Sequence, residues 1–180
     1  CKPLLWEGFA RQASGAMQTG QIQGKVIMVN CMADGGAATW MADWYRQQVQ
    51  AALGARAEDW FCLWCMEHCG HMDSASRAED LHTPGYLGAL YRALLELPQW
   101  VERGIRPSAG TRYRMENGLP TVPAGAAARG GVQPVLTLLA DGYVRDEVRA
   151  GDTVAFTLRV EHPHPADRTI RIEWSFDGEP

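Results

Sequence analysis

Two short apolar runs that do not alternate with polar residues constrain the fold of this chain most strongly. They cover residues 26–32 and 60–66, where nearly every position carries a large apolar side chain. A strand with apolar residues on consecutive positions is buried on both faces, as in parallel sheets covered by helices. The sequence therefore predicts two neighbouring parallel strands in an α/β fold.

Helical periodicity fills the interval between the two runs. Over residues 38–53 large side chains recur every three or four positions, and Gly54 follows where a left-handed residue commonly ends a helix. Strand, helix and strand in this order predict a right-handed βαβ unit. A second helix is expected over 86–103, kinked or split at Pro98. The predicted buried sides are Met41, Trp44, Tyr45, Gln48, Val49 and Leu53 in the first helix, and Leu87, Leu90, Tyr91, Leu94, Leu95, Trp100 and Val101 in the second.

The composition changes after the second helix. Residues 106–132 are rich in proline, glycine and alanine, which predicts an extended connector. Farther along, period-two or β-rich patterns predict strands with one solvent-exposed face and one buried face. These strands are expected over 135–138, 152–160 and 169–176. Three strands are fewer than the roughly seven of a complete sandwich, so we expect a partial all-β sandwich.

Charge and hydropathy exclude two classes of partner. The net charge is −4 and the basic residues form no stripe, so nucleic acid is not expected. No apolar run approaches the roughly 20 residues that span a bilayer, so no membrane partner is expected. The chain begins with Cys1 rather than methionine, and we expect it to be part of a longer or processed protein. A missing signal peptide therefore says nothing about export.

Polar residues follow each apolar run directly. Asp34 comes after the first run, and His68 and His71 come after the second. The ligand crevice of an open α/β sheet lies at the carboxyl ends of its strands. An acid and a histidine that meet there can act as a base and its orienting carboxylate. We predict Asp34 as the acid and His71 as the base, with His68 as the alternative; Asp43 is expected to be solvated.

These segments resemble the last two strand–loop units of α/β-hydrolases, including esterases. The resemblance covers residues 24–34, the helix at 39–53 and residues 60–72, with Cys69-Gly70-His71 similar to the histidine turn. It implies a triad in the order serine, acid, histidine. The tail contains Ala150-Gly151-Asp152-Thr153-Val154 and Glu173-Trp174-Ser175-Phe176-Asp177-Gly178. It resembles the opening strands of PKD-type immunoglobulin-like domains, which implies secretion or another extracytoplasmic location. The implied division is 1–105 for the carboxyl-terminal part of the hydrolase domain, 106–132 for a linker and 133–180 for a partial sandwich.

The nucleophile of such a triad is missing from the sequence. No G-x-S-x-G motif is present, and none of the serines has that context. The resemblance therefore implies that the serine and the remainder of the hydrolase domain lie upstream, and that the chain alone is inactive. The expected function of the complete protein is hydrolysis of a small-molecule or polymer ester, or of a related acyl bond, without a cofactor.

Three alternatives remain open. The chain is a non-catalytic binding or scaffold module if Asp34 and His71 point apart. A structural zinc site is conceivable in the dense Cys/His cluster, although two cysteines three apart on a strand point to opposite faces. Its members are Cys62, Cys65, His68, Cys69 and His71. An amino-terminal Cys1 nucleophile is the weakest alternative.

Overall fold

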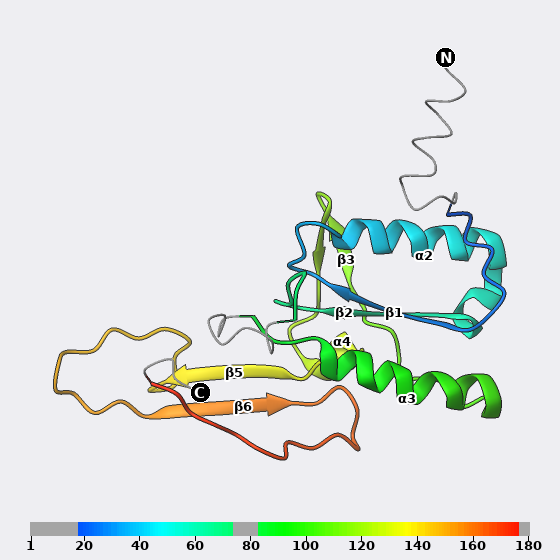
Figure 1. Cartoon of the computed structure of the whole chain (residues 1–180). Helices are drawn as coiled ribbons and strands as arrows, with labels where there is room; N and C mark the ends of the chain where they lie inside the picture. Colours follow the sequence, from blue (N-terminus) through cyan, green and yellow to red (C-terminus); the bar gives the residue numbers. More distant parts are fainter. Residues whose placement is uncertain (1–17, 74–82, 177–180) are drawn as a thin grey trace.

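The computed structural model describes residues 18–73 and 83–176 (Figure 1). At its centre, β1 (Val26–Cys31) and β2 (Phe61–Met66) pair in parallel. Helix α2 (Thr39–Leu53) and the 3₁₀ helix η1 (Gly54–Asp59) connect them. The predicted strand–helix–strand unit is confirmed. The α/β class holds in this coarse form, because the described residues contain helices and small strand pairs but no large parallel sheet.

Two helices sandwich this sheet. Figure 1 shows α2 on one side of β1 and β2 and α3 (Leu87–Arg103) on the other. Helix α2 ends at Leu53, directly before Gly54, as predicted; Gly54 has a positive φ of 57°, but its ψ of −134° is not that of the expected left-handed helical conformation. Helix α3 contains Pro98 and continues through it as one element, so the expected split does not occur.

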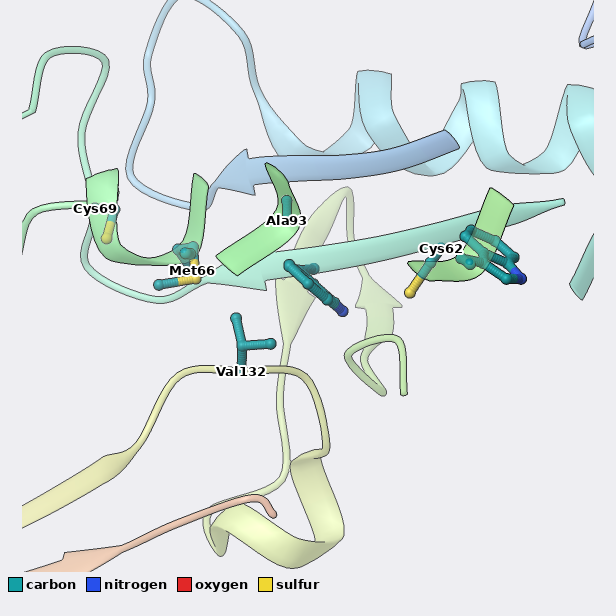
Figure 2. Packing of buried hydrophobic residues seen from close by; sticks show 8 residues of the cluster. Cys62, Met66, Cys69, Ala93 and Val132 are labelled. Atoms are coloured by element: carbon teal, nitrogen blue, oxygen red, sulfur yellow. The ribbon is translucent and has the colours of Figure 1, made fainter. Parts of the chain in front are cut away.

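Side chains of the two strands alternate between two hydrophobic clusters. The cluster on the α3 side is drawn in Figure 2, where Met66 and Cys69 lie at one end, Cys62 at the other and Val132 beneath. Its buried members are Cys62, Trp64, Met66, Cys69, Ala89, Ala93, Trp100 and Val132. The buried members on the α2 side are Ala42, Val49, Ala57, Phe61, Leu63 and Cys65. Both faces of β2 are therefore buried, as its apolar run predicts.

The helices do not bury all the side chains that the sequence predicts. Helix α3 packs through Ala89, Ala93 and Trp100, because two alanines let its backbone approach the sheet closely. The larger side chains expected inside are exposed: Leu90, Tyr91, Leu94, Leu95 and Val101. In α2, Met41 and Trp44 are likewise exposed, whereas the expected solvated Asp43 is buried. The prediction was wrong here because large apolar residues line more than one side of each helix.

Residues 106–132 are not the extended connector that their composition predicts. They contain an antiparallel pair, β3 (Arg114–Glu116) and β4 (Leu119–Thr121), and a short helix, α4 (Ala126–Arg129). Part of the segment runs along β2, where the Thr111 N–H donates to the carbonyl of Leu63 over 2.9 Å. This segment therefore belongs to the packed structure around the sheet.

The expected partial sandwich is a single two-stranded antiparallel sheet. It consists of β5 (Val135–Ala140) and β6 (Phe156–Glu161). Residues 169–176 form no strand and are exposed, so the predicted third strand is wrong. Period-two alternation produces a strand only where another backbone is available for pairing. Among the described helices none is long and apolar enough to cross a bilayer.

Candidate functional site

The loops that follow β1 and β2 meet at one end of the sheet. The Met32 N–H donates to the carbonyl of Met66 over 2.9 Å, and the Ala33 N–H donates to the carbonyl of Cys69 over 3.0 Å. These bonds continue the parallel pairing beyond the strands. They hold the residues just before Asp34 beside those just before His71.

The structure brings Asp34 and His71 together at this rim. The Nδ1 atom of His71 lies 2.9 Å from Oδ2 of Asp34. The other carboxylate oxygen, Oδ1, accepts the N–H groups of Gly36 and Ala37 over 2.7 Å and 2.9 Å. Gly36 packs beside the imidazole, where a Cβ would lie 3.6 Å from His71 Nδ1, at ordinary van der Waals distance. The carboxylate is thus fixed by its own loop and presents one oxygen to the histidine.

The same contacts set the ionisation of Asp34. The N–H of Ala37 has the largest effect and lowers the pKa of this carboxyl group. Burial raises the pKa, but His71 and Gly36 lower it further, so it stays below its ordinary value. Asp34 is therefore ionised at neutral pH and can only accept hydrogen bonds. The Nδ1–H of His71 is then the donor, which leaves Nε2 with its lone pair. His71 is 68% exposed at its side chain, against 9% for Asp34.

The sequence assigned no supporting role to Asn30, and it favoured a solvated loop for Asp73, which is buried. Asn30, buried on β1, donates through Nδ2 to the carbonyl of Ala37 over 3.4 Å and so ties the acid loop to the strand. Asp73, also buried, accepts the N–H groups of Tyr86 and Leu87 at the start of α3. Asp73 precedes that helix by more than ten residues, too far for a local capping motif to reveal it.

The alternative histidine is not brought to the acid. His68 is exposed and adopts a left-handed conformation with φ of 62°. It lines a cavity of about 500 Å³ beside Glu67 and Arg129, and it makes no hydrogen bond to Asp34. A second cavity, of about 660 Å³, lies along β2. Neither Asp34 nor His71 lines either cavity; the His71 side chain is exposed at the rim, and Asp34 lies beneath it.

No described serine lies beside His71. Ser108 donates to Oε1 of Glu96 over 3.1 Å and accepts from Arg92 over 2.9 Å. Ser175 lies in the segment after β6. Three further serines lie outside the described residues: Ser14, Ser74 and Ser76. Among the described residues, the hydrogen-bonded pair of Asp34 and His71 therefore has no neighbouring serine hydroxyl.

The cysteines do not build the zinc site considered above. Cys62 and Cys65 belong to the clusters on opposite faces of the sheet. Within residues 18–73 and 83–176, no three His, Cys, Asp or Glu side chains are arranged to hold a metal ion. Cys1, the remaining alternative nucleophile, lies outside the described residues.

The two edges of the sheet differ, which bears on where a nucleophile can be placed. On the outer edge of β2, the Cys65 N–H donates to Thr111 Oγ1 over 3.0 Å, and Gln133 bonds both the N–H and the carbonyl of Glu67. The backbone N–H and carbonyl groups of the even-numbered residues of β1 point towards β2. The backbone groups of Ile27 and Val29 therefore point to the opposite edge of the sheet. No strand of the described residues pairs with that edge.

Comparison with known proteins identifies no relative of this chain: it matches no protein-family model, no curated protein and no solved structure.

Proposed function

We propose that this chain supplies the acid and the base of a serine hydrolase that cleaves an ester or a related acyl bond. The observation that carries the proposal is the 2.9 Å contact between His71 Nδ1 and Asp34 Oδ2 at the carboxyl ends of two parallel strands. A hydrogen bond of this length lies within the range expected for a base and its orienting group. The PKD-like tail and an extracytoplasmic location remain parts of this proposal that rest on resemblance.

The roles follow from the ionisation of the pair. His71 Nε2 would take the proton of a serine hydroxyl as the serine oxygen attacks the carbonyl carbon of the substrate. The imidazolium that forms is stabilised by the carboxylate of Asp34. It then gives the proton to the leaving alcohol, and a water molecule releases the acyl group by the same two steps. General base catalysis of this kind contributes about 10²–10⁴ in rate.

The open edge of β1 supports a nucleophile from outside the described residues. A further parallel strand can add only there, because Thr111 and Gln133 already occupy the backbone groups of β2. The carboxyl end of such a strand would lie at the same rim as Asp34 and His71. In α/β sheets of this kind, a serine on the turn after a strand is exposed at that rim.

The test uses the protein expressed from its complete coding sequence. A fluorophosphonate, which labels an activated serine, and p-nitrophenyl butyrate, which reports ester hydrolysis, are applied to wild type and variants. Asp34→Asn should keep the fold and lower kcat by about 10⁴-fold, because the amide no longer holds the required tautomer of His71. His71→Ala should abolish both labelling and turnover.

His68→Ala is the matched control, since it removes a neighbouring histidine that does not contact the acid. It should retain labelling and turnover. Full activity in Asp34→Asn and His71→Ala, or loss of activity only in His68→Ala, would overturn the proposal.

An exposed aromatic cluster favours a second candidate, a polymer-binding module. Phe156, Trp174 and Phe176 lie with ring centroids 5.8–6.4 Å apart, and Trp174 and Phe176 are stacked with an interplanar angle of 12°. All three are exposed. Exposed aromatic groups of this kind mark interaction surfaces. Sedimentation with insoluble cellulose or chitin tests this candidate: wild type should bind, and Trp174→Ala should bind about tenfold more weakly.

A further inference from the structure

Two cysteines stand at the base of the two loops that carry Asp34 and His71. Cys31 ends β1, three positions before the acid, and Cys69 comes two positions before the histidine. Each thiol group is close enough to shift the pKa of the other. Cys69 is a buried member of the hydrophobic cluster on the α3 side, as labelled in Figure 2, and Cys31 packs against the same cluster. The backbone bond from Ala33 to Cys69 already holds the two loops at this spacing.

The two thiols are not equivalent. Cys69 is fully buried, whereas Cys31 is only half-buried and can be reached from solvent. The neighbouring Cys69 thiol lowers the pKa of the Cys31 thiol, although burial and the nearby carboxylates oppose this change. The Cys31 thiol, together with burial, raises the pKa of Cys69. Cys31 is therefore the thiol that reacts first with an external reagent, and Cys69 then attacks the mixed disulfide on Cys31.

We propose that Cys31 and Cys69 form a reversible disulfide that joins the acid loop to the histidine loop, with a low-molecular-weight disulfide as the oxidant. The Cys31 thiolate attacks one sulfur of the oxidant, forms a mixed disulfide and releases one thiol. Cys69 then loses its proton and attacks the Cys31 sulfur, which releases the second thiol. Two protein thiols are oxidised and one external disulfide is reduced, so atoms and electrons balance.

The other two described cysteines provide the contrast. Cys62 and Cys65 face opposite sides of β2, so they cannot pair with each other without disrupting the strand. Burial raises the pKa of Cys62 to about 11 and that of Cys65 to about 12. Both should stay reduced under conditions that oxidise the first pair.

The disulfide would cross-link the two loops that carry Asp34 and His71. Its effect on catalysis rests on the proposed function, but its formation does not. Closing a loop of about 38 residues restricts the unfolded chain. For a chain of this size the expected rise in Tm is about 10 °C.

The experiment equilibrates the folded chain with oxidised and reduced glutathione. Cys1→Ser serves as the background, because Cys1 lies outside the described residues and would compete as a free thiol. Intact mass and peptide mapping under non-reducing conditions should show loss of two hydrogen atoms and a Cys31–Cys69 peptide. The oxidised form should melt about 10 °C higher than the reduced form, and dithiothreitol should reverse the change.

Cys31→Ser in the same background should show neither the cross-link nor the rise in Tm. If Cys69→Ser folds poorly, Cys31→Ser alone keeps the test decisive, because Cys31 is the more exposed partner. A folded protein that forms no cross-link, or forms one mainly through Cys62 or Cys65, overturns the proposal. Mass and melting are measured without substrate, so inactivity towards esters would count against the proposed function and not against the disulfide.

Discussion

The two edges of the central sheet are built differently although their strands are similarly apolar. The edge of β2 is closed by side chains that reach it from far along the chain, Thr111 and Gln133. The edge of β1 has no described strand beside it, and most of its residues are only half-buried. Closing one edge with side chains stops the sheet there, while an edge of free backbone groups is a template for another strand. The difference teaches that this sheet can grow in one direction only.

The largest expected loss of stability comes from truncating Trp64, which lies on β2, the strand with the covered edge. This side chain is fully buried, and its Nε1–H donates to the carbonyl of Ser108 over 3.1 Å. Trp64→Ala should lower the free energy of unfolding by about 4 kcal/mol, measured by urea denaturation. Val29, which is half-buried, pairs with Trp64 in the sheet. Val29→Ala should lower the free energy of unfolding by only about 1 kcal/mol. Equal losses at the two positions would contradict the asymmetry.

A smaller effect is expected from the hydroxyl group that covers the edge of β2. Thr111 is buried, and its Oγ1 accepts the N–H of Cys65. Gly131 lies so close to this hydroxyl, with φ of 72°, that the segment has little room to rearrange. Thr111→Val keeps the shape but leaves a buried N–H unpaired, which should cost about 1–3 kcal/mol in urea denaturation. Thr111→Ser keeps the acceptor and should stay within about 1 kcal/mol of wild type; equal losses in both variants would refute this role.

Acid should weaken the attachment of the edge-covering segment to α2. Asp43 accepts from Tyr113 over 2.6 Å and from Arg46 and Gln47. Burial raises the pKa of Asp43, but these hydrogen bonds outweigh it and leave the pKa below its ordinary value. The stability that this depressed pKa contributes is present above the ordinary carboxyl pKa of about 4 and is lost as pH falls through the lower folded value.

Urea denaturation of wild type and Asp43→Asn between pH 2 and 7 measures this contribution. The difference in stability between the two proteins should shrink as the pH falls below about 4. A difference that stays constant with pH would show that the charge of Asp43 has no part in the attachment.

The last prediction needs no mutation. Amide hydrogen exchange of the unmodified chain compares the protection of backbone N–H groups at the two edges of the sheet. The N–H groups of Ile27 and Val29 should exchange about 100-fold faster than that of Cys65, which is bonded to Thr111. Met28 is the internal control, because its N–H faces β2 in the same strand. In the protein from the complete coding sequence, slow exchange at Ile27 and Val29 would indicate an added strand. Unchanged fast exchange there would count against one.

Much of the fold was predictable where the signal is local. The non-alternating runs identify β1 and β2, and the helical spacing that ends at Gly54 identifies α2. Period-two alternation locates β6 but fails for residues 169–176, which pair with no strand in the part of the chain that the structure describes. A large apolar residue also does not show which side of a helix is buried. Packing of Ala89 and Ala93 against the sheet decided that for α3.

The candidate site was likewise predictable only in part: local sequence signals gave its position, and the packed structure gave its contacts. Its position follows from the chain alone, because polar residues directly after two buried parallel strands must lie at one rim of the sheet. Three-dimensional contacts were needed to select His71 over His68, to hold Asp34 through Gly36 and Ala37, and to place Cys31 against Cys69. They also closed one edge of the sheet with Thr111 and Gln133. Periodicity reports only on neighbours within a few positions. The turn that holds Asp34 is local, but the other contacts join residues 37 to 66 positions apart and exist only once the chain has packed.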